Sequence, residues 1–229
     1  MAANRTAHRR RPAAVGRRRG PSGWAVAAVV TLVLFAGAVG VGVYRAQQAD
    51  ALVVPAGATA TGVAVGSPDA PVTVDVYLDF QCPACRAYEA QSGATLDELV
   101  AAGAARVVYH PVAYLDRFSS TRYASRSSAA AGCAAEAGVY PRFQALLFAH
   151  QPPENTAGLP DERLVALGEQ AGAGPDFGTC VAEERYAAWT AHETDEASRA
   201  GITATPTVLV DGREIARTDE ALRAAVPIP

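Results

Sequence analysis

DFQCPACRAYEA, residues 79–90, places two cysteines three positions apart, Cys82 and Cys85, with a proline between them. Such a pair can be a redox centre, half of a metal site or a buried structural bond. Pro83 suits the first position of a helix, where its missing N–H costs no hydrogen bond. The stretch therefore predicts a helix that begins at Pro83 and has Cys82 at its N-terminus.

The residues before the cysteines alternate in character, as a half-buried β-strand does. In PVTVDVYLDF, residues 71–80, every second side chain is apolar: Val72, Val74, Val76, Leu78 and Phe80. A helical pattern then runs to Gly103, and RVVYHPVAY, residues 106–114, predicts a second strand. The order strand, helix, strand predicts two parallel strands joined by a right-handed crossover.

Residues 118–200 carry helical patterns and no strong strand pattern. Four segments show the helical period: 125–136, 142–150, 161–171 and 177–199. TPTVLVDGREIAR, residues 205–217, then predicts a hairpin with an Asp-Gly turn, and a short helix over 220–225 follows. The chain is therefore an α/β domain with a helical block between its two strand-bearing parts.

The N-terminal region differs from the rest in charge and hydropathy. Residues 1–45 hold eight arginines and no acid, which leaves 12 of the 20 basic residues against all 23 acids in residues 46–229, a net charge of −11. Trp24–Tyr44 is free of charge over 21 residues, enough to span a bilayer as a helix. Seven arginines precede this span, so we expect a cytoplasmic N-terminus and an exported remainder.

This region has two other interpretations, a cleaved signal peptide and a tail that binds nucleic acid. A cleaved signal peptide has a shorter apolar stretch of about 7 to 15 residues, although cleavage after the span stays an alternative. A basic tail can bind nucleic acid, but beside a transmembrane helix it is more simply a topology signal, and no nucleic-acid partner is expected.

The remaining cysteines and the histidines do not predict a metal site. Four cysteines allow three pairings, but Cys133 and Cys180 are 47 residues apart and have no histidine at ligand spacing. His110, His150 and His192 are each isolated in sequence. We expect no metal and no other cofactor. Cys133 and Cys180 both lie in the helical block on the exported, oxidising side, which predicts a structural disulfide between them.

The position of the Cys-x-x-Cys pair gives its two sulfurs different roles. Cys82 faces unpaired backbone N–H groups and the positive end of the helix dipole, which stabilise a thiolate. Cys85 lies one turn further in and is less exposed. We therefore expect Cys82 to attack and Cys85 to resolve the mixed disulfide. A static bond in an oxidising compartment is the alternative.

The combination of features resembles the DsbA-like thiol:disulfide oxidoreductases of the thioredoxin superfamily, of the membrane-anchored bacterial type. The resemblance runs from about residue 60 to 226 and is carried by DFQCPAC and by TPTVLVDG, residues 205–212. It implies a thioredoxin fold with an inserted helical domain, and a cis Pro206 packed against the cysteine pair. It also implies that the backbone of Thr205 pairs with an extended substrate segment.

The resemblance also implies the biological setting and the division of the chain. Exported proteins with cysteine pairs would be the substrates, and a quinone-linked membrane partner of the DsbB or vitamin-K-epoxide-reductase type would reoxidise the enzyme. The expected parts are a basic cytoplasmic tail (1–23), a transmembrane helix (24–44), a linker (45–62), the first part of the thioredoxin fold (63–117), the helical insertion (118–200) and its second part (201–229).

Two departures leave the direction of the reaction open. Strongly oxidising members have histidine where this chain has Ala84, and thioredoxins carry a buried acid where it has Val76, flanked by Asp75 and Asp79. We expect a disulfide oxidase. A reductase or isomerase on the same fold, or a non-catalytic tethered binding module with a structural Cys-x-x-Cys, are the alternatives.

Overall fold

The computed structural model describes residue 24, residues 31–37 and 39–40, and residues 52–227. The chain divides into two units, residues 1–51 and 52–229, and the described residues of the first unit are helical. Within the described part of the chain, no helix is both long enough and apolar enough to cross a membrane. The basic tail 1–23, much of the predicted span 24–44 and residues 45–51 of the linker lie outside the described residues.

A six-stranded sheet of order β1-β2-β4-β3-β5-β6 forms the centre of the second unit. Its strands are β1 (Ala58–Thr59), β2 (Gly62–Val65), β3 (Val72–Leu78), β4 (Ala105–Pro111), β5 (Thr207–Val210) and β6 (Arg213–Glu214). Strands β3 and β4 are parallel and are joined by α2 (Pro83–Ala101), which confirms the predicted pair of parallel strands joined through a helix. The remaining strand pairs are antiparallel.

The local sequence explains the two central features of this sheet. On β3, Val74, Val76 and Leu78 are buried and the intervening residues are half-buried, as the period-2 pattern predicts. Between β5 and β6, Asp211 and Gly212 have φ angles of 48° and 76°. Both lie in the left-handed region that a tight hairpin turn requires, and the predicted Asp-Gly hairpin is confirmed.

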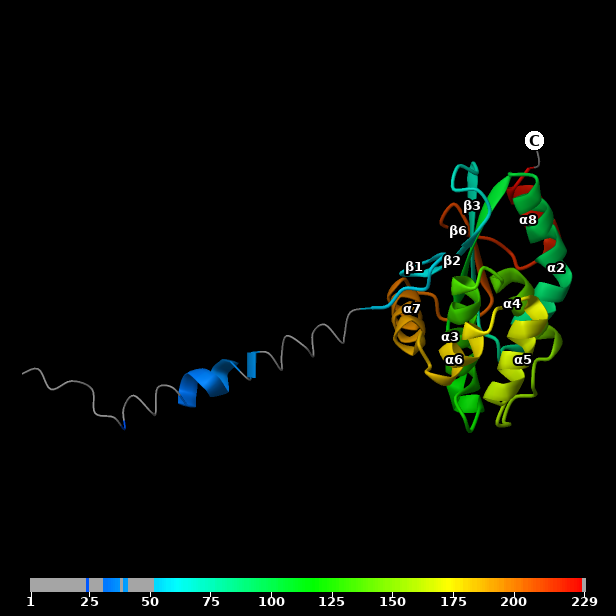
Figure 1. Cartoon of the computed structure of the whole chain (residues 1–229). Coiled ribbons are helices and arrows are strands. Elements are labelled where there is room, and N and C mark those ends of the chain that lie inside the picture. The colour runs from blue at the N-terminus through cyan, green and yellow to red at the C-terminus, as the bar shows by residue number, and fades with distance from the viewer. Residues whose placement is uncertain (1–23, 25–30, 38, 41–51, 228–229) are drawn as a thin grey trace, which may run out of the picture. The chain divides into compact units, whose positions relative to one another are not determined.

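Helices cover both faces of the sheet. They are α2, α3 (Tyr123–Glu136), α4 (Tyr140–Ala149), α5 (Asp161–Ala171), α6 (Asp176–Ala182), α7 (Ala187–Arg199) and α8 (Asp219–Ala225), with a 3-10 turn η1 (Asp116–Phe118). Figure 1 shows α2 and α8 on one side of the sheet, α7 on the other, and α3 to α6 gathered at one end. The domain is thus the α/β thioredoxin fold with added helices.

Two sequence expectations differ from the structure. The helical segment 177–199 is two helices, α6 and α7, because Glu184 has a φ of 45° that no α-helix can accommodate. The sheet also begins at Ala58, inside the predicted linker. Strands β1 and β2 have two and four residues, too few for a periodic pattern to reveal them.

The insertion and the sheet share one hydrophobic core. Trp189 of α7 is fully buried and donates its indole N–H to the carbonyl of Thr59 at 3.0 Å. Phe80, which follows β3, lies 5.2 Å from Phe148 of α4 between ring centres. The helical insertion therefore packs directly against the segment that carries the cysteines.

Candidate active site

Cys82 and Cys85 are both free thiols at the start of α2. Cys82 is the N-cap residue with an extended backbone, and Pro83 follows it as the first helical residue. The carbonyl of Cys82 accepts hydrogen bonds from the N–H groups of Cys85 at 3.1 Å and Arg86 at 3.2 Å. The exposed fraction is 7% for Cys82 and 2% for Cys85, so the sulfur at the helix N-terminus is the more accessible one.

The environment separates the two thiols in acidity. The pKa of Cys82 is lowered from 9.0 to about 6, and the hydrogen bond from the Cys85 side chain is the largest cause. Burial acts in the opposite direction and raises the pKa. The backbone N–H groups of Ala84 and Cys85 lower it further. Burial raises the pKa of Cys85 well above its ordinary value, and the neighbouring Cys82 adds to this. At neutral pH Cys82 is a thiolate and Cys85 a thiol, the pattern of a nucleophilic and a resolving cysteine.

The Thr-Pro pair lies beside Cys82. The Thr205–Pro206 peptide bond is cis, Pro206 is buried, and the carbonyl oxygen of Thr205 is 3.4 Å from the Cys82 sulfur. The structure thus brings together two pairs of predicted site residues that are at least 120 positions apart in the sequence, Cys82 with Cys85 and Thr205 with Pro206.

A cleft of about 530 Å³ opens next to Cys82. Leu115, Ile202 and Ala204 give it apolar walls, and Arg117 and Glu154 add one charge of each sign. Its volume lies in the range of small-molecule and side-chain binding pockets. The cleft can therefore hold side chains of a polypeptide whose cysteine reaches the Cys82 sulfur.

A family model described as Thioredoxin matches residues 58–227. The chain belongs to the thioredoxin superfamily. A disulfide bond oxidoreductase (DsbG) from Mycobacterium tuberculosis, in its reduced form, is similar with a TM-score of 0.65 and 33% identity, over 73% of this chain and 89% of that chain. Oxidised DsbA from the same organism gives a TM-score of 0.64 and 33% identity, over 72% and 94%. These relatives confirm the kinship with DsbA-like thiol:disulfide oxidoreductases.

The curated relatives are larger proteins. The serine/threonine-protein kinase PknE of Mycobacterium tuberculosis is 35% identical over 127 residues, which are 52% of this chain and 22% of the kinase. The Na(+)/H(+) antiporter NhaA 3 of Salinispora tropica is 34% identical over 149 residues, which are 65% of this chain and 21% of the antiporter. The thioredoxin-superfamily chain spans about a fifth of the length of these two relatives.

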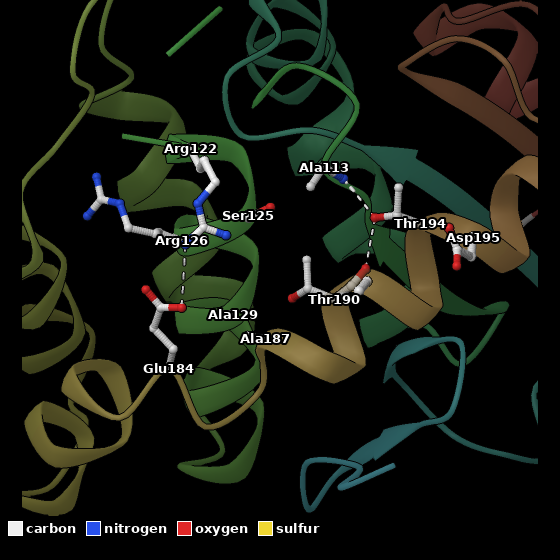
Figure 2. A pocket seen from close by; sticks show the side chains of 11 residues that line it. Ala113, Arg122, Ser125, Arg126, Ala129, Glu184, Ala187, Thr190, Thr194 and Asp195 are labelled. Atoms are coloured by element: carbon white, nitrogen blue, oxygen red, sulfur yellow. Dashed lines mark hydrogen bonds and ion pairs between the residues drawn. The ribbon is translucent and has the colours of Figure 1, made fainter. Parts of the chain in front are cut away.

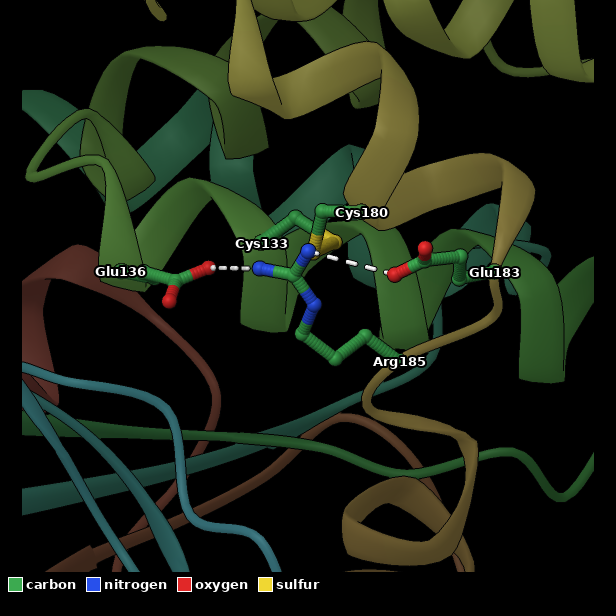
Figure 3. The surroundings of a disulfide bond; sticks show 5 residues. All are labelled: Cys133, Glu136, Cys180, Glu183 and Arg185. Carbon is green, nitrogen blue, oxygen red and sulfur yellow. Dashed lines mark hydrogen bonds and ion pairs between the residues drawn. A yellow bond between two sulfur atoms is a disulfide. The ribbon is translucent and has the colours of Figure 1, made fainter.

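The other two cysteines of this thioredoxin-superfamily protein form a disulfide. Cys133 of α3 and Cys180 of α6 are joined, with 6.0 Å between their Cα atoms, the pairing predicted from the sequence. Figure 3 shows Arg185 beside this bond, with ion pairs to Glu136 at 3.1 Å and Glu183 at 3.2 Å. The bond is fully buried and ties two helices of the insertion together.

A second cleft of about 260 Å³ lies between α3 and α7 (Figure 2). Arg122 and Glu184 form an ion pair of 3.8 Å at one side, and Thr194 accepts a hydrogen bond from the N–H of Ala113 at the other. The residues that line it include no cysteine. Its lining offers no thiol chemistry and shares no residue with the cleft beside Cys82.

The two acids that flank Val76 have separate environments. Asp75 binds His110 at 3.0 Å, and His110 binds Glu193 of α7 at 2.9 Å. Burial opposes protonation of His110, but the bonds to both carboxylates outweigh it and raise the pKa of His110 to about 9. Asp75 is therefore part of a charged link between β3, β4 and α7, and not of the cysteine site.

Asp79 is the acid that lies at the cysteines. It is fully buried, its N–H donates to the Cys85 sulfur at 3.4 Å, and its carboxylate accepts from the N–H groups of Gln81 and Leu115 at 2.8 and 2.9 Å. Burial raises the pKa of Asp79 to about 7, and the nearby Cys82 adds to the rise. The strand alternation placed Asp79 on the half-buried face, but β3 ends at Leu78 and the chain turns inward after it.

Proposed function

We propose that the chain is a membrane-tethered, extracytoplasmic disulfide oxidase, whose Cys82–Cys85 disulfide accepts electrons from cysteine pairs of exported proteins. The observation that carries the proposal is the contrast between the two thiols, with the pKa of Cys82 lowered to about 6 and that of Cys85 raised. A stabilised Cys82 thiolate favours the reduced form of the pair. A stabilised reduced form makes the disulfide a stronger oxidant.

The reaction consists of two exchanges at sulfur. In the first, a substrate thiolate attacks Cys82, the Cys82–Cys85 bond breaks, and Cys85 leaves and takes up a proton, which its raised pKa favours. In the second, the thiolate of the other substrate cysteine attacks the sulfur of the first substrate cysteine in the mixed disulfide. The substrate disulfide forms, and Cys82 leaves as a thiolate. Two electrons pass to the enzyme, and the substrate gains one disulfide.

The substrate segment lies against the Thr205 backbone in this proposal. An extended peptide would add to the Thr205–Thr207 edge by main-chain hydrogen bonds, which tolerate varied sequence. The cleft lined by Leu115 and Ile202 would take a side chain next to the reacting cysteine. Main-chain recognition suits an enzyme that must accept many unrelated exported proteins.

The cellular setting is supported by the sequence. The uncharged stretch Trp24–Tyr44 would anchor the domain, and the seven arginines before it would keep the N-terminus in the cytoplasm. A quinone-linked membrane protein of the DsbB or vitamin-K-epoxide-reductase type would return the dithiol to the disulfide. That partner is proposed from the kinship with DsbA-like proteins.

The redox state of the Cys82–Cys85 pair in intact cells tests the direction of the reaction. Cells are quenched with acid, free thiols are alkylated with a reagent of high mass, and the full-length chain is resolved by mobility. An oxidase is held mostly as the disulfide, so most of the chain should resist alkylation. A chain found mostly as the dithiol would instead support a reductase or isomerase, and the double variant Cys82→Ser, Cys85→Ser gives the background from Cys133 and Cys180.

A further inference from the structure

Gln151 makes a contact with the cysteine loop that links it to the helical insertion. It is the second residue after α4, and its side-chain amide nitrogen donates to two carbonyl oxygens, that of Phe80 at 2.9 Å and that of Cys82 at 3.0 Å. The two acceptors lie on either side of Gln81 in the sequence. One side chain therefore holds both ends of the tripeptide that leads into α2.

Both carbonyl groups need a partner at these positions. Phe80 is fully buried, and a buried carbonyl without a hydrogen bond is costly. The carbonyl of Cys82 starts the helical hydrogen bonds, since it accepts from Cys85 and Arg86 as well. Its direction sets the direction of the first turn of α2. The orientation of that turn decides where the N–H groups next to the Cys82 sulfur point.

The loop that carries Gln151 is itself anchored beside the site. The N–H of Asn155 donates to the carbonyl of Phe118 at 2.7 Å, and the side chain of Gln81 donates to the same carbonyl at 3.0 Å. The N–H of Ser120 donates to the carbonyl of Thr156 at 3.3 Å. Because the loop is held at several points, the amide of Gln151 is presented to the cysteine loop in a defined position.

We propose that Gln151 is a positioning residue of the redox site, which holds the carbonyl groups of Phe80 and Cys82 so that the first turn of α2 directs its N–H groups at the Cys82 sulfur. The proposal rests on the proposed function only in taking Cys82 as the reactive thiol. It gives the helical insertion a part in the chemistry, because the insertion supplies the group that orients the catalytic turn.

The contact also acts electrostatically. The two carbonyl oxygens carry partial negative charge, one of them on the same residue as the sulfur, and the amide hydrogens of Gln151 offset it. The groups beside Cys82 whose charge bears on its acidity include Cys85 and Asp79, and Arg117 and Glu154 are the charged residues that line its cleft. A change at Gln151 alone leaves all four in place, so a shift in Cys82 acidity reports the amide contact.

The test is Gln151→Met, which keeps the length of the side chain and removes its donor. The matched control is Thr156→Val. It removes a hydroxyl that donates to the carbonyl of Pro153 and accepts from the N–H of Gly158, and neither bond involves the cysteine loop. The pKa of Cys82 is measured on the reduced full-length protein from the ultraviolet absorbance of the thiolate. Circular dichroism and the unfolding midpoint show whether each variant is folded.

The expected result is an upward shift of about 0.5 to 1 pKa unit in Q151M and none in T156V, if the hydrogen bond to the Cys82 carbonyl, one of the two that Q151M loses, has ordinary strength and sets the shift. The thiolate fraction at pH 6 then falls about two- to fivefold. An unchanged Cys82 pKa in folded Q151M overturns the proposal, as does an equal shift in T156V. If Q151M does not fold, Gln151→Leu decides, because it also removes the donor and adds no charge; its Cys82 pKa should rise by the same amount, and an unchanged value overturns the proposal.

Exchange with a dithiol peptide is measured separately on the oxidised wild-type protein. A wild type that fails to oxidise the peptide removes the oxidase role, while a shifted pKa in Q151M still supports the positioning role. A wild type that oxidises the peptide, together with an unshifted Q151M, removes the positioning role alone. The two proposals therefore fail on different results.

Discussion

Replacement of Cys85 by alanine should raise the pKa of Cys82, because the Cys85 side chain is the largest cause of its low value. A hydrogen bond to a charged acceptor contributes about 1.5 to 3 kcal/mol. At 1.36 kcal/mol per pKa unit this is about one to two units. The Cys82 pKa in Cys85→Ala should therefore rise from about 6 to about 7 or 8, still below its ordinary value because the backbone N–H groups remain.

The assay is the rate of alkylation of Cys82 by a small reagent as a function of pH, since only the thiolate reacts. Cys85→Ser is the control. Its hydroxyl can donate from the same position, so the Cys82 pKa in this variant should lie below that in Cys85→Ala. The reasoning fails if Cys85→Ala still titrates near 6. In that case the helix N-terminus alone would stabilise the thiolate, and the neighbouring thiol would have no part in the acidity of Cys82.

Three further predictions concern the groups around the site and the insertion. Titration of Asp79 near pH 7 should add a step to the pH profile of Cys82 alkylation, and Asp79→Asn should remove that step because asparagine does not titrate. If the step persists in Asp79→Asn, another group causes it. The raised pKa of His110 stabilises the folded state by up to about 3 kcal/mol. This stability is fully present below pH 6.5 and is lost as the pH rises through 9. Urea unfolding at pH 6 and 9.5 should show this loss in the wild type and not in His110→Phe, and an equal loss in both would contradict it. Replacing Cys133 and Cys180 by alanine should lower the free energy of unfolding by about 4 kcal/mol, from the 47-residue separation that the bond closes, and a loss below about 1 kcal/mol in urea unfolding would refute that estimate.

The features that could be predicted from the sequence are those with local causes. The alternation in residues 71–80 gave β3, and a proline directly after a cysteine gave the start of α2. The Asp-Gly pair at 211–212 gave the β5–β6 hairpin, because a tight turn demands left-handed residues there. Two distant motifs, DFQCPAC and TPTVLVDG, were enough to infer the fold that brings Cys82 to Thr205.

The features that escaped prediction depend on contacts between distant segments. Asp79 follows the last strand residue, where the alternation no longer says which way a side chain points. Gln151 reaches Cys82 across 69 positions of sequence, and only the packing of α4 against the sheet brings them together. Strand β1 has two residues and gains its place from pairing with β2, not from its own pattern.

The reduction potential of the Cys82–Cys85 couple tests the oxidase role most directly. The oxidised full-length protein is equilibrated with glutathione buffers of known potential, and the dithiol fraction is measured by alkylation and mass. A thiolate at Cys82 favours the reduced form, so the potential should lie well above the roughly −270 mV of thioredoxin, between about −180 and −120 mV. A value at or below about −270 mV would place the couple among reductases and contradict the account.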